Sequence, residues 1–411
     1  MEDSAFSRIL ENLKGKEDKI ISAAPGRADF LNTHQDYKGL PVVPIAVNLR
    51  TYMTVLDEED KFIVNSLTLK REKSKHTDEF ERNNPPLLGE SKWFGNYLRA
   101  VVKALNKFKG IEFNKGLRII IDSDIPIGSG LASSAALEVS FLTLLNYYFN
   151  IGLSKEEIAE LAFLSENQVM KIPCGRLDQY SSAIGGAILI YPNPPVKIEK
   201  LPLENLHFVI VDSGIRHSVS EIHPVRQKEI DNGLKELLNL NIPSSLKEKL
   251  GQHYYDTKWQ EIKLDEINNY LSRIDKVSAK RIIFTLKMQE CTEIALKIIY
   301  NRKLSSEELG KIDAEEHDDK IVLIGKVMNK QHELLRDYYD VSLPEIEMIR
   351  SSMLKAGALG VKISGAGMGG SLIALVRDKD SSKRVIDAAL KSGAANGWYV
   401  EISEGAKIIN P

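Results

Sequence analysis

Pro126-Ile-Gly-Ser-Gly-Leu-Ala-Ser-Ser-Ala-Ala136 is the stretch that decides how the first half of the chain folds. An apolar run at residues 117–122, typical of a buried strand, precedes it, and a run rich in Ala, Leu and Ser at residues 131–149 predicts a helix. Gly128 and Gly130 permit a tight turn, and the first N–H groups and the dipole of a helix stabilise an anion. The order strand, glycine loop, helix therefore predicts a phosphate-binding loop.

Two common loops of this kind do not fit. No Gly-Lys-Ser/Thr follows, as a Walker A loop requires, and the third glycine of the dinucleotide fingerprint is missing. A Gly/Ser loop before a helix is also an ordinary turn and cap, so this one indicates function only together with partner residues elsewhere.

The composition is that of an ordinary globular chain. Its 411 residues with 43% hydrophobic content favour two domains, and the net charge of −2 provides no basic field for nucleic acid or an anionic membrane. Cys174 and Cys291 are too few for a disulfide framework or a four-ligand zinc site. No run approaches the roughly 18 apolar residues of a spanning helix. We therefore expect a cytoplasmic protein without nucleic-acid or membrane partners, either a monomer or a homodimer.

The other elements are expected in a mixed α/β order. Ser154 and Glu157 form a capping box for a helix that reaches about residue 169, and Asp178 lies near the start of a short helix. Further expected elements are a strand at 41–55, a hairpin-like region at 57–73, a helix at 93–108, a helical stretch at 225–300, and strands at 186–191, 206–211, 361–363, 371–376 and, as the last element, 398–402. A domain change is expected near residue 200, giving domains 1–200 and 201–411.

Three segments in order resemble the motifs of the GHMP kinases. They are residues 25–39 (Pro-Gly-Arg-Ala-Asp-Phe-Leu-Asn-Thr-His-Gln-Asp-Tyr-Lys-Gly), the loop at 126–136, and residues 363–371 (Ile-Ser-Gly-Ala-Gly-Met-Gly-Gly-Ser). The galactokinase branch is indicated by Pro-Cys-Gly-Arg-Leu-Asp-Gln at 173–179, Ile-Arg-His-Ser at 215–218 with Pro-Val-Arg at 224–226, and Met328-Asn329 with His332 and Leu-Arg-Asp at 335–337. The resemblance implies an α/β, two-domain GHMP kinase fold with its active site in the interdomain cleft. It also implies an ATP-dependent kinase that phosphorylates the C1 hydroxyl of a sugar.

By this resemblance, Arg27 and Asp178 are the catalytic pair. Phosphoryl transfer needs a cation and a group that handles the attacking hydroxyl, and a carboxylate can accept that proton. Without the motif, Arg27 would be an ordinary surface arginine and Asp178 a helix N-terminal aspartate. Mg²⁺ prefers hard oxygen ligands, and Ser134 and Glu166 match the family's pair. The resemblance assigns ATP to Trp93, Gly128, Ser129, Gly130, Leu131, Ala132, Ser133, Ser134, Gly365 and Gly367, although core packing accounts for Trp93 equally well.

The expected sugar contacts are Thr33, His34, Asp36, Gly175 and His223, and two of them depart from the galactokinase pattern. Galactokinases read Glu-His-x-Asp where this chain reads Thr33-His34-Gln35-Asp36, and His223 stands in place of a sugar-contacting tyrosine. Losing a carboxylate and gaining a possible cation lessens repulsion of a sugar with a C6 carboxylate. These two changes therefore make galacturonate an alternative substrate, and N-acetylgalactosamine is another. Galactose, which the resemblance implies, stays the expected substrate. A non-catalytic sugar and ATP sensor is the alternative from another class.

Overall fold

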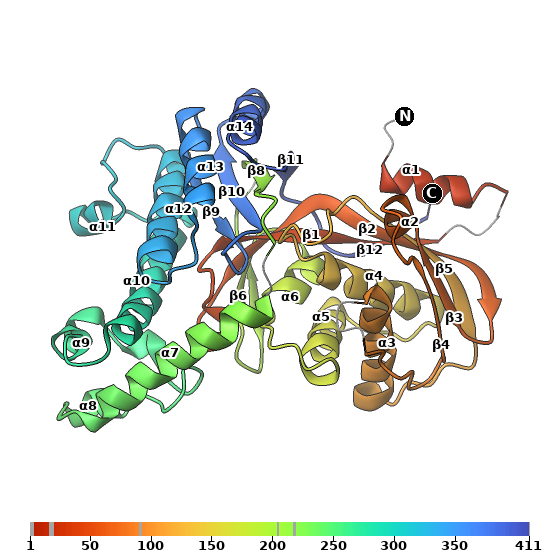
Figure 1. Ribbon diagram of the computed structural model, residues 1–411, viewed down its shortest axis with the longest axis horizontal. Helices are drawn as coiled ribbons and strands as arrows, with labels where there is room; N and C mark the ends of the chain where they lie inside the picture. Colours follow the sequence, from red (N-terminus) through yellow and green to blue (C-terminus); the bar gives the residue numbers. More distant parts are fainter. Residues whose placement is uncertain (1–3, 16–19, 90–92, 204, 217–218, 411) are drawn as a thin grey trace. The chain divides into compact units, whose positions relative to one another are not determined.

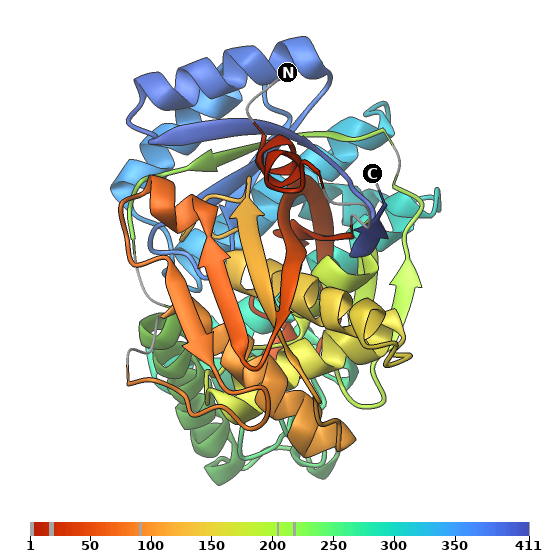
Figure 2. The same ribbon diagram turned by 90° about the vertical axis from the view of Figure 1, so that its right-hand side faces the viewer.

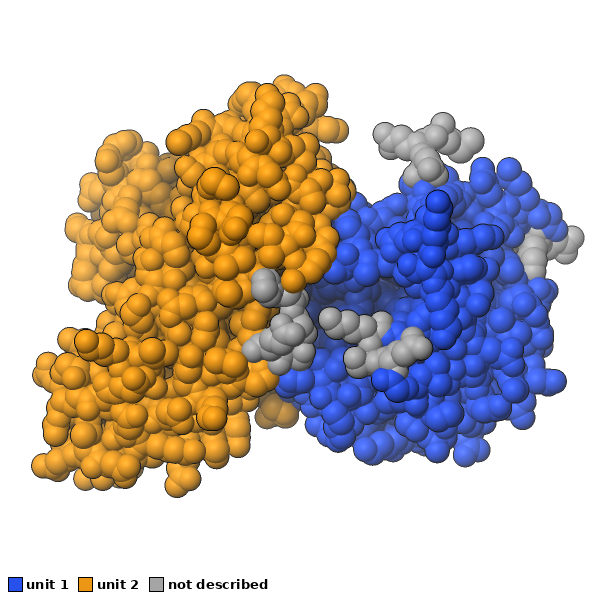
Figure 3. Space-filling view, viewed as in Figure 1, with its two compact units in different colours: residues 1–27, 45–186, 402–411 blue, residues 28–44, 187–401 orange. Residues whose placement is uncertain are grey.

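The structure, a computed structural model, describes residues 4–15, 20–89, 93–203, 205–216 and 219–410. Within them the chain forms two compact units, and Figure 3 colours them separately. The first unit comprises residues 1–27, 45–186 and 402–411, and the second comprises 28–44 and 187–401. This division differs from domains 1–200 and 201–411 in three segments: residues 28–44 and 187–200 belong to the second unit, and residues 402–411 belong to the first. The boundary near residue 200 therefore stays a prediction. Residues 217 and 218 of the Ile-Arg-His-Ser segment lie outside the described residues.

The first unit contains a six-stranded sheet in the order β12-β1-β2-β5-β3-β4. Helices α3, α4, α5 and α6 contact one another, whereas α1 and α2 contact β5. Figures 1 and 2 show the two groups of helices on opposite faces of the sheet. The bounds are α1 Ala5–Asn12, β1 Ile21–Leu31, β2 Val43–Glu59, β3 Phe62–Ser66, α2 Leu67–Arg71, β4 Thr77–Phe80, α3 Phe94–Ala104, β5 Gly116–Ser123, α4 Ser133–Tyr148, α5 Lys155–Leu164, α6 Leu177–Ile184 and β12 Lys407–Ile409.

Two expectations for this sheet are wrong. β2 and β3 form no hairpin, because β5 lies between them, antiparallel to β2 and parallel to β3. β5 is buried at six of its eight positions, so the centre of the sheet is where its apolar side chains are best covered. The chain also does not end on the strand expected at 398–402, because β12 follows and pairs with the start of β1.

The second unit contains the antiparallel sheet β11-β8-β10-β9 and the small hairpin β6-β7. Helices α12 and α13 contact β9, and α14 contacts β8 and β11. The bounds are β6 Ile188–Tyr191, β7 Lys197–Lys200, β8 His207–Asp212, α7 Val219–Asn239, α8 Ser244–Lys247, α9 Leu264–Leu271, α10 Lys276–Ile299, α11 Ser306–Lys311, α12 Lys320–Asp337, α13 Pro344–Lys355, β9 Gly360–Ser364, β10 Ser371–Val376, α14 Lys379–Lys391 and β11 Asn396–Glu401. No helix within the described residues combines the length and apolarity needed to cross a membrane.

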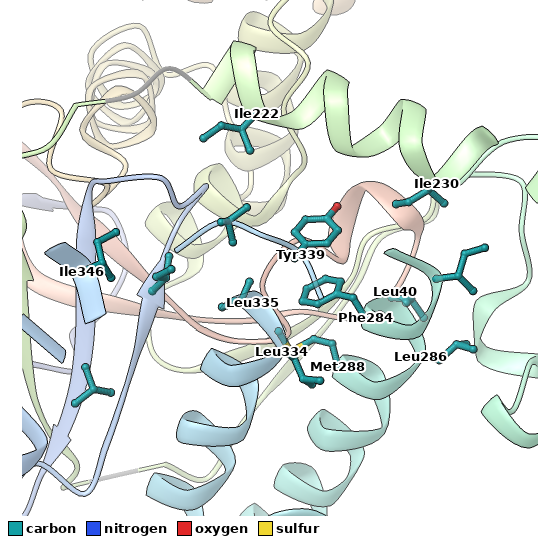
Figure 4. Packing of buried hydrophobic residues seen from close by; sticks show 14 of the residues in the cluster. Leu40, Ile222, Ile230, Phe284, Leu286, Met288, Leu334, Leu335, Tyr339 and Ile346 are labelled. Atoms are coloured by element: carbon teal, nitrogen blue, oxygen red, sulfur yellow. The ribbon is translucent and has the colours of Figure 1, made fainter. Parts of the chain in front are cut away.

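The core of the second unit joins its helices to the segment around Leu40. Figure 4 shows Tyr339 packed over Phe284 there, with Leu334, Leu335 and Met288 close by. The two rings stack with centroids 4.0 Å apart. The apolar burial of this cluster holds the end of α12 and the residues after it against the segment that carries the first motif.

Several local predictions are confirmed. β5, the glycine loop and α4 follow in the expected order, and the capping box of Ser154 and Glu157 starts α5. Asp178 lies in the first turn of α6, and β9 and β10 flank the third motif.

Candidate functional site

Arg27 and Asp178 form an ion pair in the first unit, together with a carbonyl of the phosphate loop. Arg27 Nε and Nη2 both lie 2.7 Å from Asp178 Oδ1, and Nη1 donates to the carbonyl oxygen of Gly130 at 2.6 Å. The side chain of Arg27 is 9% exposed and that of Asp178 is 35% exposed. We call Arg27, Gly130 and Asp178 the candidate catalytic cluster. Both contacts with the Arg27 guanidinium use the same carboxylate oxygen of Asp178, Oδ1.

The Pro-Gly turn before Arg27 explains how the cluster is held. The N–H of Arg27 donates to the carbonyl of Leu131 at 3.1 Å, and Ser182 Oγ of α6 donates to the carbonyl of Pro25 at 2.7 Å. A Cβ atom on Gly26 would lie 2.8 Å from the oxygen of Leu131. Only glycine therefore allows β1 to approach the loop this closely.

The phosphate loop ends at the N-terminus of α4 in a left-handed residue. Gly128, Gly130 and Ala132 have φ values of 71°, 78° and 55°, and Ser129 Oγ donates to the carbonyl of Pro126 at 2.8 Å. No side chain caps the helix. The first N–H groups of α4, at Ser133 and Ser134, thus remain available to an anion, as the sequence predicts for phosphate.

Two buried carboxyl groups lie side by side behind this loop. Glu166, on the π-turn 165–169 after α5, accepts a hydrogen bond from Gln179 Nε2 at 3.2 Å and contacts the hydroxyl of Ser134. Glu138 on α4 is fully buried, and apart from the carboxyl group of Glu166 its oxygens find no hydrogen-bond partner in the described part of the chain. Burial, and then the charge of Glu166, raise the pKa of Glu138 well above its ordinary value. A hydrogen bond between the two carboxyl groups needs one proton, so we expect the pair to hold one.

The remaining ATP and sugar candidates of the first unit are Trp93 and Gly175. Trp93 is 7% exposed, its Nε1 has no hydrogen-bond partner among the described residues, and Lys75 Nζ lies 4.2 Å from the ring centroid. Gly175 lies in the loop just before α6. Burial alone does not separate core packing from a nucleotide contact, so the assignment of Trp93 stays a prediction.

The sugar motif belongs to the second unit, where aromatic side chains surround His34. The His34 ring centroid lies 5.1 Å from that of His223 and 4.9 Å from that of Tyr339, and Tyr37 lies 5.2 Å from His223. We call His34, Tyr37, His223 and Tyr339 the aromatic cluster. His223, expected near the sugar from the sequence, thus does lie beside the motif. Asp36 is half-buried at the start of the 3₁₀ turn Asp36–Lys38.

Thr33 contacts a buried lysine. Lys362, in the middle of β9, is fully buried, and its Nζ donates to Thr33 Oγ1 at 2.6 Å and to the carbonyl of Asp29 at 2.8 Å. The residue that replaces the family's glutamate therefore accepts a hydrogen bond from an ammonium group.

The third motif forms a glycine loop between β9 and β10. Gly365 and Gly367 have φ values of 93° and 84°, and a Cβ on Gly367 would lie 2.6 Å from the oxygen of Val341. His34 Nε2 lies 3.0 Å from the oxygen of Ala366, so the sugar motif and the glycine loop are hydrogen-bonded within the second unit.

Sequence reasoning missed Glu138, Lys362, Tyr37 and Tyr339. A signal existed for the first two, since Glu138 interrupts a helix and Lys362 a strand that are otherwise apolar or small. Charged residues in such runs are rarely buried without a partner or a function. The tyrosines carry no comparable signal.

Three family models match the chain. "GHMP kinases N terminal domain" matches residues 96–186, "GHMP kinases C terminal" matches 309–395, and "Galactokinase galactose-binding signature" matches 11–56. The chain belongs to the GHMP kinases. The N-terminal match ends at α6 and includes the phosphate loop, Glu166 and Asp178, and the galactose-binding signature includes Arg27 and Thr33.

Among relatives, this GHMP kinase is similar to galactokinases. It is 28% identical to one from Clostridium beijerinckii over 99% of this chain and 98% of that one, and 28% identical to one from Pyrococcus furiosus over 95% and 99%. The galactokinase of Lactococcus lactis, solved with galactose, shares the fold with a TM-score of 0.77 and 24% identity over 98% of this chain and 100% of that one. A mevalonate kinase from Methanococcus jannaschii gives 0.63 and 19% over 95% and 100%. The expected α/β GHMP kinase fold is confirmed.

Proposed function

We propose that the protein is an ATP-dependent sugar kinase that transfers the γ-phosphoryl group of ATP to the C1 hydroxyl of galactose. The observation that carries the proposal is the ion pair of Arg27 with Asp178, whose arginine also bonds to Gly130 of the phosphate loop. Arg27, a cation, thus contacts both the proposed base and the proposed phosphate-binding loop. The galactose-binding signature supports galactose as the acceptor.

In the proposed reaction, the C1 oxygen forms a bond to the γ-phosphorus while the bond from that phosphorus to the β,γ-bridging oxygen breaks. The C1 hydroxyl proton passes to Asp178 Oδ2, and ADP leaves with the bridging oxygen. Arg27 keeps the carboxylate oriented through Oδ1, and its guanidinium stabilises negative charge that develops on the phosphoryl oxygens. The N–H groups at the start of α4 hold the phosphates.

Mg²⁺ fits the residues behind the loop. Ser134 and Glu166 offer the hard hydroxyl and carboxylate oxygens that Mg²⁺ prefers, and Glu166 forms no ion pair in the described part of the chain. When bound, Mg²⁺ would neutralise phosphate charge. The neighbouring Glu138 would remain neutral by keeping the proton of the pair.

A second candidate, galacturonate, is favoured by the contact between Thr33 and Lys362. If residue 33 faces C6, the pocket offers a hydroxyl backed by an ammonium group where the galactokinase pattern has a carboxylate. Such a pocket repels a C6 carboxylate less than the family's pocket does.

A coupled assay of ADP release over galactose, galacturonate, N-acetylgalactosamine, glucose and mevalonate tests these proposals. Efficient turnover of galactose supports the first, and turnover of galacturonate alone supports the second. Binding of ATP and sugar without ADP release would make the protein a sensor. A product that has lost its reducing end places the phosphate on C1.

A further inference from the structure

Four polar groups of the second unit form a continuous hydrogen-bonded chain from α12's C-terminal end to the glycine loop. Tyr339 Oη lies 2.6 Å from Tyr37 Oη, Tyr37 Oη lies 3.2 Å from His34 Nδ1, and His34 Nε2 lies 3.0 Å from the oxygen of Ala366. His34 and Tyr339 are buried, and Tyr37 is half-buried. Three segments distant in sequence are therefore joined by side-chain hydrogen bonds.

The chemistry of the groups gives this chain one direction. A carbonyl oxygen only accepts, so His34 Nε2 carries the hydrogen. Burial, and then the neighbouring His223, hold the pKa of His34 well below 6.5, so the ring is neutral and Nδ1 accepts. Tyr37 therefore donates its hydroxyl hydrogen to Nδ1, and its oxygen accepts a hydrogen bond from the hydroxyl of Tyr339. The donor of each hydrogen bond in this series is thus fixed.

The surroundings of His34 agree with a neutral ring. Besides Tyr37 and Tyr339, the charged groups that act on it are His223, Lys38 and Lys362, and each of these three disfavours a positive charge there. The carbonyl of Ala366 favours a positive charge, but burial and His223 outweigh it. Burial also raises the pKa of Tyr37 well above 10, which keeps its proton in place.

This series of hydrogen bonds restrains two backbone segments with unusual conformations. His34 has a φ of 65°, a left-handed conformation that is strained for a residue with a side chain. Ala366 lies between Gly365 and Gly367, both at positive φ, a conformation that glycine adopts without steric cost. A hydrogen bond from His34 to the oxygen of Ala366 fixes both conformations relative to each other.

We propose that Tyr37 and Tyr339 are positioning residues, which act through His34 to hold the sugar motif and the glycine loop 365–370 in one arrangement for phosphoryl transfer. The role in transfer rests on the proposed kinase function, whereas the hydrogen-bonded chain itself does not.

The first test needs no activity. In protein labelled with ¹⁵N-histidine, we expect the His34 signals at pH 7.5 to be those of a neutral ring protonated on Nε2, with His34→Gln identifying them. Tyr37→Phe should shift the Nδ1 signal, because it removes the donor, and Tyr338→Phe, the adjacent tyrosine outside the chain, should not. A ring protonated on Nδ1, or a Tyr37→Phe spectrum like that of the wild type, overturns the inference.

The second test is kinetic. We expect Tyr37→Phe to lower kcat/KM for the sugar about tenfold, the size of one lost buried hydrogen bond, with most of the loss in kcat. Tyr339→Phe should act in the same direction, and the double variant should be no worse than Tyr37→Phe, because Tyr339 acts through Tyr37. Tyr338→Phe should stay within about twofold of wild type, since no hydrogen bond is lost. Additive losses, or Tyr37→Phe kinetics equal to those of Tyr338→Phe, refute the positioning role. A wild-type protein that turns over no sugar refutes the kinase proposal instead. The ¹⁵N spectra would then still test whether the hydrogen-bonded chain from Tyr339 to Ala366 exists.

Discussion

Replacing Asp178 by asparagine should separate catalysis from stability. The substitution keeps an oxygen that can accept from Arg27 Nε and Nη2, now at 2.7 Å, but removes the negative charge and the proton acceptor. A hydrogen bond between two charged groups is worth roughly 1.5–3 kcal/mol and a neutral one about 0.5–1.5 kcal/mol. Because the carboxylate is 35% exposed, solvent screening reduces the difference, and we expect a loss of about 1 kcal/mol or less in the free energy of unfolding.

The effect on turnover should be much larger. Removing a positioned general base typically lowers a rate by about 10²–10⁴-fold, which corresponds to roughly 3–5 kcal/mol in activation free energy. The affinity for ATP should change little, because the loop N–H groups and Ser134 are untouched. We would measure kcat by coupled ADP release at saturating galactose, ATP affinity by calorimetry with a non-hydrolysable analogue, and stability by urea denaturation.

Asp340→Asn provides the matched control. Asp340 pairs with the buried Arg281 at 2.8 Å and is 48% exposed, so the same exchange alters an aspartate–arginine ion pair of the second unit. It should cost similar stability and leave kcat near that of the wild type. If Asp178→Asn retains kcat within about tenfold, or if Asp340→Asn loses as much, Asp178 is not the general base.

Three further substitutions test other parts of the two units. Gly26→Ala should weaken ATP binding about tenfold or more, because its Cβ would lie 2.8 Å from the oxygen of Leu131 and displace the phosphate loop. The control is Gly310→Ala on α11, where the added Cβ meets open space. It should leave the free energy of unfolding in urea unchanged or slightly raised. Thr33→Glu should raise the ratio of kcat/KM for galactose to that for galacturonate by about tenfold or more, through repulsion of the C6 carboxylate. In the wild type, the free energy of unfolding should fall as the pH decreases below about 6.5, because His34 binds a proton in the unfolded chain but not when it is buried in the folded protein. This fall amounts to at most about 1.4 kcal/mol per pH unit. His34→Gln should make it less steep, because the group that binds the proton is gone.

Each of these has a clear contrary outcome. Unchanged ATP affinity in Gly26→Ala would mean that the loop tolerates the extra atom. An unchanged sugar preference in Thr33→Glu would show that residue 33 does not face C6. Equal pH slopes for His34→Gln and wild type between pH 5 and about 6.5 would show that His34 is charged in the folded protein.

What the sequence predicts best is local. The strand, loop and helix from β5 to α4 follow from apolar periodicity and two glycines, and the start of α5 follows from one capping box. The predicted hairpin at 57–73 is wrong because strand pairing there depends on contacts between residues far apart in the sequence. Pairing of β3 with β5 joins residues more than 50 positions apart, and no local pattern distinguishes that partner from the nearer β2.

The candidate site shows the same limit in side chains. Arg27 and Thr33 are six positions apart in one motif, yet Arg27 belongs to the first unit with Asp178 and Thr33 to the second with Lys362. A motif identifies residues that serve one function, but it does not say which neighbours hold each of them in place.

The substrate question changes once Lys362 is considered together with Thr33. From the sequence, threonine in place of glutamate removes a negative charge from the sugar pocket. In the structure, Thr33 accepts a hydrogen bond from the side-chain nitrogen of the buried Lys362. A glutamate at position 33 would therefore form an ion pair with this lysine. A buried charge that loses an opposite charge is costly, and a substitution at one of two such positions constrains the other. Lys362→Met in the wild type should therefore lower any preference for galacturonate, whereas in Thr33→Glu it should leave the new carboxylate buried without its partner and cost more stability than the sum of the two single changes. Additive losses in urea denaturation would show that the two positions do not act as a pair, and the choice of sugar would then have to be sought among the remaining contacts of the motif, first of all at His223.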